Sequence, residues 1–214
     1  MKINAQEIIK ASNIPYFTRS NLSVVLGTNR RVLDYRIKSL IKSGMLEFVK
    51  PGFYINKYLY EREPQKEEFM EYISSVIAFP SYISLEYALA KYNFLAESVF
   101  KITCVTAKNP KIFNTNFISF VYKNIKQNLF SDFEEKKYKD NVYYFAPLYK
   151  ALFDYLYLTP FKSAEDAKSL LFSSRFNWDV LSNDERTKFT RFVVASGSKK
   201  MNRVLNYLAK QKIL

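Results

Sequence analysis

Apolar and charged positions between residues 28 and 44 recur with the period of an α-helix. At about 100° per residue, one side of this helix collects the apolar residues Leu33, Ile37, Leu40 and Ile41. The opposite side collects Arg31, Tyr35, Lys38 and Lys42. Thr28 is a candidate N-cap and Gly44 a candidate C-cap, so capping residues are present at both expected ends of the helix. The pattern predicts one helix with a core face and a basic face.

The segments around this helix complete an ordered set of elements. Upstream, helical spacing over 5–11, an extended stretch over 16–18 and a second helix ended by Gly27 precede it. Downstream, apolar runs over 45–49 and 53–55 flank Lys50-Pro51-Gly52, which predicts a hairpin with Pro and Gly in its turn. This order is a helix-turn-helix followed by a wing, the layout of a winged-helix DNA-binding domain.

The basic face predicts contacts to double-stranded DNA. Arginine near the start of a recognition helix reads guanine edges in the major groove, and lysine neutralises phosphates. We expect base-edge or groove contacts from Arg31, Tyr35 and Lys38, and phosphate contacts from Arg19, Arg30, Lys42 and Lys50. Thr28 and Asn29, where the helix starts, belong to the same predicted set. The alternative is that the charged stripe is only the solvated face of a small helix.

The remaining residues predict a mixed second domain. We expect a winged-helix domain over 1–60, an acidic linker and connecting helix over 61–79, and an effector domain over 80–214. Helical spacing continues over 67–78, 84–92 and 148–158, and extended runs appear at 99–106, 112–113, 117–124 and 142–145. A polar stretch at 131–141 connects them, and the tail over 163–172, 182–195 and 198–214 is helical. The fold class is therefore α+β: an N-terminal winged helix-turn-helix, then a mixed α/β domain that ends in a helical C-terminal segment.

Charge is unevenly distributed along the 214 residues, whose formal net charge is +13. Residues 1–60 carry a net charge of +7, residues 61–100 carry −4, and residues 101–214 carry +10. Abundant lysine also arises from an AT-rich genome, but four of the nine arginines lie inside the proposed helix-turn-helix. A positive field of this kind concentrates polyanions and makes their binding depend strongly on salt.

Residue types that carry catalysis or hold metals are scarce. The chain has no histidine, which removes the usual general base and most zinc sites. Cys104, the single cysteine, is expected to be a small core residue. A chain with one cysteine forms no internal disulfide and fits a reducing cytoplasm. Asp132 and Glu134 are expected to lie in a solvated loop. Asp154 is expected to be partly buried and to bond to a helix end or to Lys150. We expect no enzyme activity, no metal and no cofactor, and neither a membrane span nor a secretion signal.

Three segments of the second domain resemble the AbiEi family of antitoxins. They read YISLEYAL at 82–89, FKITCVTAK at 100–108 and FAPLYKALFDYL at 145–156, in the family's order and spacing after a winged helix. Departures from the family pattern occur at Tyr87 and Asn109. The resemblance implies a non-enzymatic antitoxin of a phage-defence operon, which represses that operon through inverted repeats. It also implies a nucleotidyltransferase-like toxin as functional partner, opposed without necessarily forming a stable complex.

The sequence therefore predicts a DNA-binding transcriptional repressor and antitoxin that autoregulates a toxin–antitoxin operon. An inverted repeat is bound by two copies of a DNA-binding domain, so either a homodimer or two cooperatively bound monomers must occupy the operator. One alternative is an antitoxin or interaction module that binds protein directly and uses the winged helix as a scaffold. An enzyme acting on nucleic acid is disfavoured by the missing histidine and metal ligands.

Overall fold

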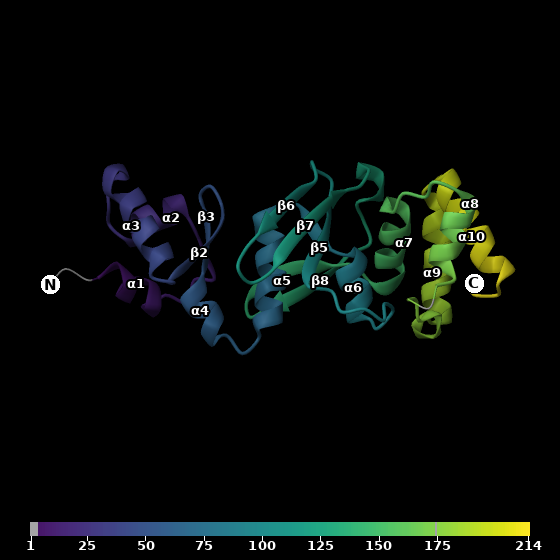
Figure 1. Cartoon of the computed structure of the whole chain (residues 1–214), viewed down its shortest axis with the longest axis horizontal. Coiled ribbons are helices and arrows are strands. Elements are labelled where there is room, and N and C mark those ends of the chain that lie inside the picture. The colour runs from purple at the N-terminus through teal and green to yellow at the C-terminus, as the bar shows by residue number, and fades with distance from the viewer. Residues whose placement is uncertain (1–3, 174) are drawn as a thin grey trace.

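The elements follow one another along the longest axis of the molecule, from an N-terminal unit through a central sheet to a C-terminal group of helices (Figure 1). This computed structural model describes residues 4–173 and 175–214. Its fold is α+β, with helices on both sides of a mixed sheet. Within the described residues, no helix combines the length and apolar character needed to cross a bilayer.

The N-terminal unit combines short helices with a three-stranded antiparallel sheet of order β1-β3-β2. In the sheet, Phe17 lies opposite Tyr54 and Glu47 opposite Ile55. Its elements in chain order are α1 (Ala5–Ala11), β1 (Tyr16–Thr18), α2 (Arg19–Val25), α3 (Arg30–Lys42), β2 (Leu46–Lys50), β3 (Phe53–Asn56) and α4 (Lys57–Arg62).

Local hydrogen bonds explain where α3 begins and ends. Asn29 is its N-cap and accepts a bond from the Val32 amide, so the cap lies one residue after the expected Thr28. Gly44 adopts a φ of +72°, as the residue after a helix often does. The Met45 amide bonds to the Leu40 carbonyl, which closes the last turn in a Schellman motif.

The central unit is built on a six-stranded sheet of order β6-β7-β5-β4-β9-β8. The pairs β4–β9 and β5–β7 are parallel, and the other three pairs are antiparallel. One face packs on α5 and the other on α6 and α7 (Figure 1). The elements are α5 (Lys66–Ile77), β4 (Ser81–Ile83), α6 (Leu85–Lys91), β5 (Lys101–Thr106), β6 (Lys111–Asn114), β7 (Ser119–Asn124), β8 (Glu134–Tyr138), β9 (Asn141–Phe145) and α7 (Leu148–Leu158).

Three further α-helices lie at the C-terminal end. These are α8 (Ala164–Leu171), α9 (Asn183–Ala195) and α10 (Lys199–Lys210). Helices α9 and α10 pack on α7, and α8 packs on α10. The rings of Phe153 on α7 and Phe192 on α9 meet edge to face, with centroids 4.6 Å apart. Glu185 accepts a 2.6 Å bond from the Tyr149 amide in the first turn of α7. The helical tail expected from the sequence is therefore confirmed.

One expectation for the middle of the chain needs correction, and the expected connecting helix is present. The polar stretch over 131–141 contains a strand, β8, which forms a hairpin with β9. Its first four residues are exposed, since charged side chains line this edge of the sheet. The connecting helix within 61–79 is α5, and eight of its twelve residues are buried between the N-terminal unit and the sheet. It therefore forms part of the central core.

Glu63 connects the segment between α4 and α5 to the β8–β9 hairpin through hydrogen bonds. Only 3 % of the residue is exposed, and its carboxylate accepts bonds from the Tyr138 hydroxyl and from Lys139 Nζ, both at 2.5 Å. Burial alone raises the pKa of Glu63. The bonds from Lys139, Tyr138 and the Gln65 amide outweigh that effect, so the pKa lies below its ordinary value.

Replacing Glu63 with Gln is expected to lower the free energy of unfolding by about 1–3 kcal/mol near neutral pH. A carboxyl whose pKa falls on folding stabilises the protein above its unfolded-state pKa and loses that contribution as pH falls. The difference in free energy of unfolding between the parent and Glu63→Gln should therefore disappear as the pH falls through the folded-state pKa of Glu63. Urea unfolding of both proteins from about pH 7 to about pH 3 measures it. A gap independent of pH would contradict this account.

Candidate nucleic-acid interface

The expected two-faced character of α3 is confirmed. Leu33, Ile37 and Leu40 are at most 4 % exposed and pack in the core of the N-terminal unit, while Ile41 is partly buried. Arg31, Tyr35, Lys38 and Lys42 are all exposed on the other side. The helix thus presents three exposed cationic side chains and Tyr35 to solvent.

Side-chain bonds hold α3 against α2. Arg19 on α2 forms an ion pair with Asp34 on α3, with 2.7 Å between Nη2 and Oδ1. Arg36 donates a 3.0 Å bond from Nη1 to the carbonyl of Leu26, just after α2. Arg19 therefore shares its charge with a carboxylate. Arg36, which was not among the predicted DNA contacts, bonds α3 to the end of α2.

The basic side chains on the exposed face remain available to a ligand. Among the described residues, no acidic side chain forms an ion pair with Arg31, Lys38 or Lys42. Three unpaired cations on one side of a helix favour a polyanion over a neutral partner. The side chain of Arg30, a predicted phosphate contact, lies outside the described part of the chain.

Thr28 and Asn29 serve the turn between α2 and α3. The side chain of Asn29 is occupied as the N-cap of α3. The Thr28 carbonyl accepts a 3.0 Å bond from Ser23, and its hydroxyl is buried without a partner among the described residues. Both residues therefore shape the turn, and neither is arranged mainly to contact a ligand.

Lys50 does not lie where a phosphate contact requires it, which corrects the sequence prediction. Its Nζ donates a 2.5 Å bond to the Ile77 carbonyl at the end of α5. The same atom lies 5.7 Å from the ring centre of Phe53 and 5.5 Å from that of Phe113. Burial, and then repulsion by Lys111, lower its pKa. The lysine points inward because the β2–β3 hairpin packs against the central unit.

Replacing Lys50 with Met is therefore expected to leave DNA affinity unchanged, because its ammonium faces α5 rather than solvent. Lys42→Met, which removes an exposed and unpaired ammonium, is the matched control and should weaken binding to every sequence alike. Anisotropy titrations of both variants on one labelled duplex make the comparison. Equal losses in the two variants would show that Lys50 does reach the DNA.

The β2–β3 hairpin is docked on the central unit by further contacts. Glu47, 6 % exposed, accepts bonds from the backbone amide and side-chain amide of Asn116 at 2.9 and 3.0 Å. Phe53 belongs to the central core. The neighbouring helix α4 adds a contact, since the ring centres of Tyr60 and Phe117 lie 4.5 Å apart. All four residues of β3 are buried. The consecutive apolar residues 53–55 could have indicated this burial from the sequence, because a strand that is apolar at consecutive positions is covered on both faces.

A second cluster of polar groups surrounds Asp154 on α7. Its carboxylate, fully buried, accepts from Lys150 Nζ at 2.5 Å, from the Ser84 hydroxyl at 2.8 Å and from the Tyr82 hydroxyl at 2.9 Å. Burial lowers the pKa of Lys150 and raises that of Asp154, and each charge partly offsets the effect on the other. The Thr103 hydroxyl donates to the Ser84 carbonyl at 2.7 Å. The predicted pairing of Lys150 with Asp154 is confirmed.

This cluster joins three segments of the chain, 82–89, 100–108 and 145–156. Tyr82 and Ser84 come from the first segment, Thr103 from the second, and Lys150 and Asp154 from the third. All five residues are at most 1 % exposed, so the cluster holds β4, β5 and α7 together and presents no surface to a substrate. Backbone strain occurs beside it, since Leu85 has a φ of +63°.

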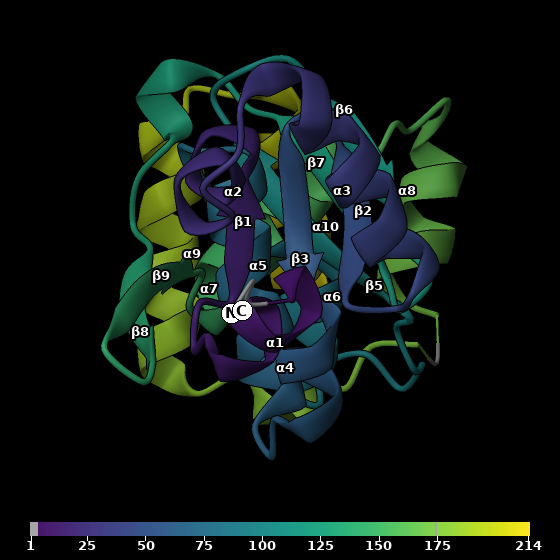
Figure 2. The same cartoon turned by 90° about the vertical axis from the view of Figure 1, so that its left-hand side faces the viewer.

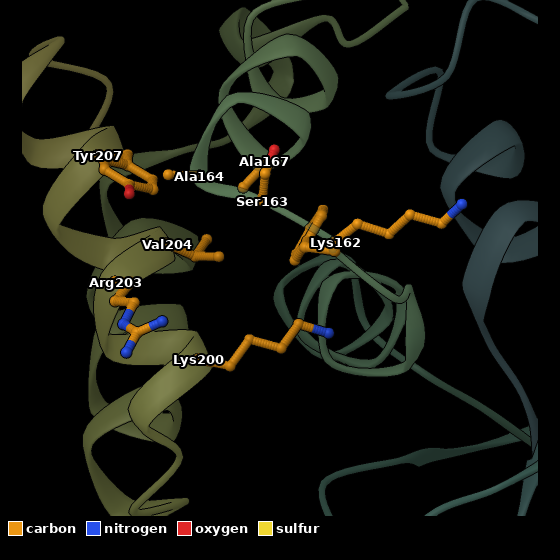
Figure 3. A pocket seen from close by; sticks show the side chains of 9 residues that line it. Lys162, Ser163, Ala164, Ala167, Lys200, Arg203, Val204 and Tyr207 are labelled. Atoms are coloured by element: carbon orange, nitrogen blue, oxygen red, sulfur yellow. The ribbon is translucent and has the colours of Figure 1, made fainter.

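A cavity of about 280 Å³ lies between α8 and α10 (Figure 3). Lys200 points into it and donates to the carbonyls of Tyr157 and Thr159, where α7 ends. Burial lowers the pKa of Lys200 to about 8. Lys162 extends away from the other labelled side chains, so the basic groups do not converge on one anion (Figure 3). Lys200 caps α7 and does not form a ligand site.

Metal ligands and the single cysteine were the remaining candidates for chemistry. Among the described residues, no cluster of three or more His, Cys, Asp or Glu side chains could hold a metal ion. Cys104 is buried, and burial raises the pKa of its thiol to about 12. The exposed face of α3 is thus the best-formed candidate site. No family model matches this chain, and no curated protein matches it.

Proposed function

We propose that residues 1–60 form a winged helix-turn-helix that binds double-stranded DNA, with α3 in the major groove. The observation that carries the proposal is the exposed face of α3, where Arg31, Lys38 and Lys42 lie without acidic partners among the described residues. The order α1-β1-α2-α3-β2-β3 and the antiparallel sheet support it. Base contacts fall to Arg31, Tyr35 and Lys38.

The position of α3 in the molecule suits this role. In Figure 1, α3 lies at the end of the long axis opposite to α8, α9 and α10. Figure 2 looks onto that end, and α3 lies in front of the central sheet. A duplex can approach this end without meeting the central unit. Because Lys50 faces inward, phosphate contacts are expected from Lys42 and the remaining N–H groups of Arg19 rather than from the wing.

We further propose that the chain is an AbiEi-type antitoxin that represses its own operon and counteracts a nucleotidyltransferase-like toxin in the cytoplasm. The resemblance of the three central segments supports this proposal, as does their meeting around Asp154. Repression through inverted repeats requires two copies, bound as a homodimer or cooperatively as monomers. The antitoxin activity belongs to residues 80–214, and no catalytic step is assigned to the chain.

Selection from a pool of random DNA duplexes tests the DNA-binding proposal without knowledge of the operator. The full chain should enrich an inverted repeat, and binding to the enriched duplex should weaken steeply as salt rises. The pool selected with Lys42→Met should give the same repeat with lower affinity. Failure to enrich any sequence at low salt would overturn the proposal.

One observation favours a second candidate, a module that binds protein and uses the winged helix as scaffold. The wing packs on the central unit through Glu47, Lys50 and Phe53, so these three side chains are unavailable to DNA. In that case the product of a neighbouring gene should co-purify with the chain. Co-purification unaffected by Arg31→Ala and Lys38→Ala, together with a failed DNA selection, would support this candidate.

A further inference from the structure

Two exposed side chains on α3 are apolar or aromatic although neither helps to form the core. Val32 is 41 % exposed and Tyr35 is 76 % exposed. They are three positions apart, so they are neighbours on the helix surface. The core of the N-terminal unit draws instead on Leu33, Ile37 and Leu40.

Helix stability does not explain these two residues. A β-branched side chain such as Val32 loses rotamer freedom in a helix, and an aromatic side chain does so too. An exposed position on a helix is better served by Ala, Glu, Lys or Arg. A local choice that opposes stability without a packing gain is typical of a functional surface.

The exposed face of α3 divides into two parallel strips. At about 100° per residue, Val32, Tyr35 and Ser39 lie within one strip. Arg31, Lys38 and Lys42 lie within the other. The first strip is weakly polar and uncharged, and the second is cationic. Val32 and Arg31 both belong to the first turn, from which recognition helices contact base edges.

The chemistry of the major groove supplies one apolar target for such a strip. Thymine presents a 5-methyl group there, and the other three common bases present only hydrogen-bonding edges or ring C–H. Apolar side chains meet this methyl group and remove it from water. A strip of Val32 and Tyr35 beside Arg31 has the composition needed to distinguish thymine next to the base that Arg31 contacts.

We propose that Val32 and Tyr35 contact the 5-methyl groups of thymine in the major groove, and that α3 thereby selects thymine. This inference rests on the proposed DNA-binding function and adds a specificity rule to it. Val32 covers the methyl group with its isopropyl side chain, and Tyr35 does so with its ring. The cationic strip supplies affinity, and the uncharged strip supplies part of the selectivity.

The test compares the selected duplex made with thymine and the same duplex made with uracil, which differs only by the missing methyl groups. We expect the parent to bind the uracil duplex about fourfold more weakly for each contacted methyl, the value of one buried methylene. Val32→Ala and Tyr35→Ala should each shrink the difference between the two duplexes. Tyr35→Phe, which keeps the ring, should preserve it.

Val194→Ala is the matched control, because Val194 on α9 is a 64 % exposed helical valine far along the chain from α3. Val194→Ala should leave the difference in affinity between the thymine and uracil duplexes unchanged. Equal parental affinity for the thymine and uracil duplexes would overturn the inference while leaving DNA binding itself established. Tighter binding after methylation of cytosines, with no response to uracil, would also overturn it, since the methyl source would then be 5-methylcytosine. A selection that enriches nothing would instead remove the proposed function.

Discussion

Replacing Lys150 with Met is expected to lower the free energy of unfolding by about 3–5 kcal/mol, because it leaves a buried carboxylate without its cation. Lys150 and Asp154 are both fully buried, and their ion pair joins adjacent turns of α7. The Tyr82 and Ser84 hydroxyls still donate to Asp154 in the variant, but neither carries a charge. Urea denaturation followed by circular dichroism measures the loss.

The chain contains its own control for this experiment. Lys188 and Asp184 on α9 form an ion pair with the same spacing, but their side chains are 50 % and 70 % exposed. Lys188→Met should leave the free energy of unfolding almost unchanged, because solvent and salt screen an exposed ion pair. The double variant Lys150→Met/Asp154→Leu should recover part of the loss, because no buried charge remains. A Lys150→Met variant as stable as Lys188→Met would contradict the account.

Replacing Arg31 with Ala is expected to weaken binding to the selected repeat by about 1–3 kcal/mol, or about five- to 150-fold. Arg31 is exposed in the first turn of α3 and lacks an acidic partner among the described residues, so its guanidinium is free to reach a guanine edge. The loss should be largest for the preferred sequence, because a base contact distinguishes sequences.

Lys42→Met provides the comparison for Arg31→Ala. It removes a phosphate contact, so it should lower affinity for all duplexes alike and reduce the magnitude of the salt slope by about one. Gel-shift titrations on the selected repeat and on a scrambled duplex, at several salt concentrations, separate the two effects. An Arg31→Ala variant that binds both duplexes as the parent does would remove Arg31 from the interface.

Local patterns in the sequence were sufficient where burial repeats with a regular period. The helix over Leu148–Leu158 has the predicted bounds, and the two faces of α3 have the predicted residues. Pro147 and the helix caps act within one turn of chain, so neighbouring residues are enough to predict them. The choice between Thr28 and Asn29 as N-cap remained open to error, because both side chains can accept the capping bond.

Features that depend on distant residues could not be predicted in the same way. The direction of Lys50 is determined by Ile77, Phe113 and Lys111, which are remote in sequence. Strand β8 lacks an alternating apolar pattern because it lies at a sheet edge, where charged residues prevent pairing with other chains. The partners of Asp154 other than Lys150 come from β4 and the start of α6, about seventy residues earlier. Only the assembled sheet brings these groups together.

The docked hairpin has a further consequence for operators. With Glu47 bound to Asn116 and Lys50 bound to Ile77, α3 has a fixed distance and angle to the central sheet instead of a flexible tether. In a homodimer, the distance between the two copies of α3 would then be fixed by the rigid protein between them. Such a dimer would accept half-sites at one spacing and reject repeats with a few inserted base pairs.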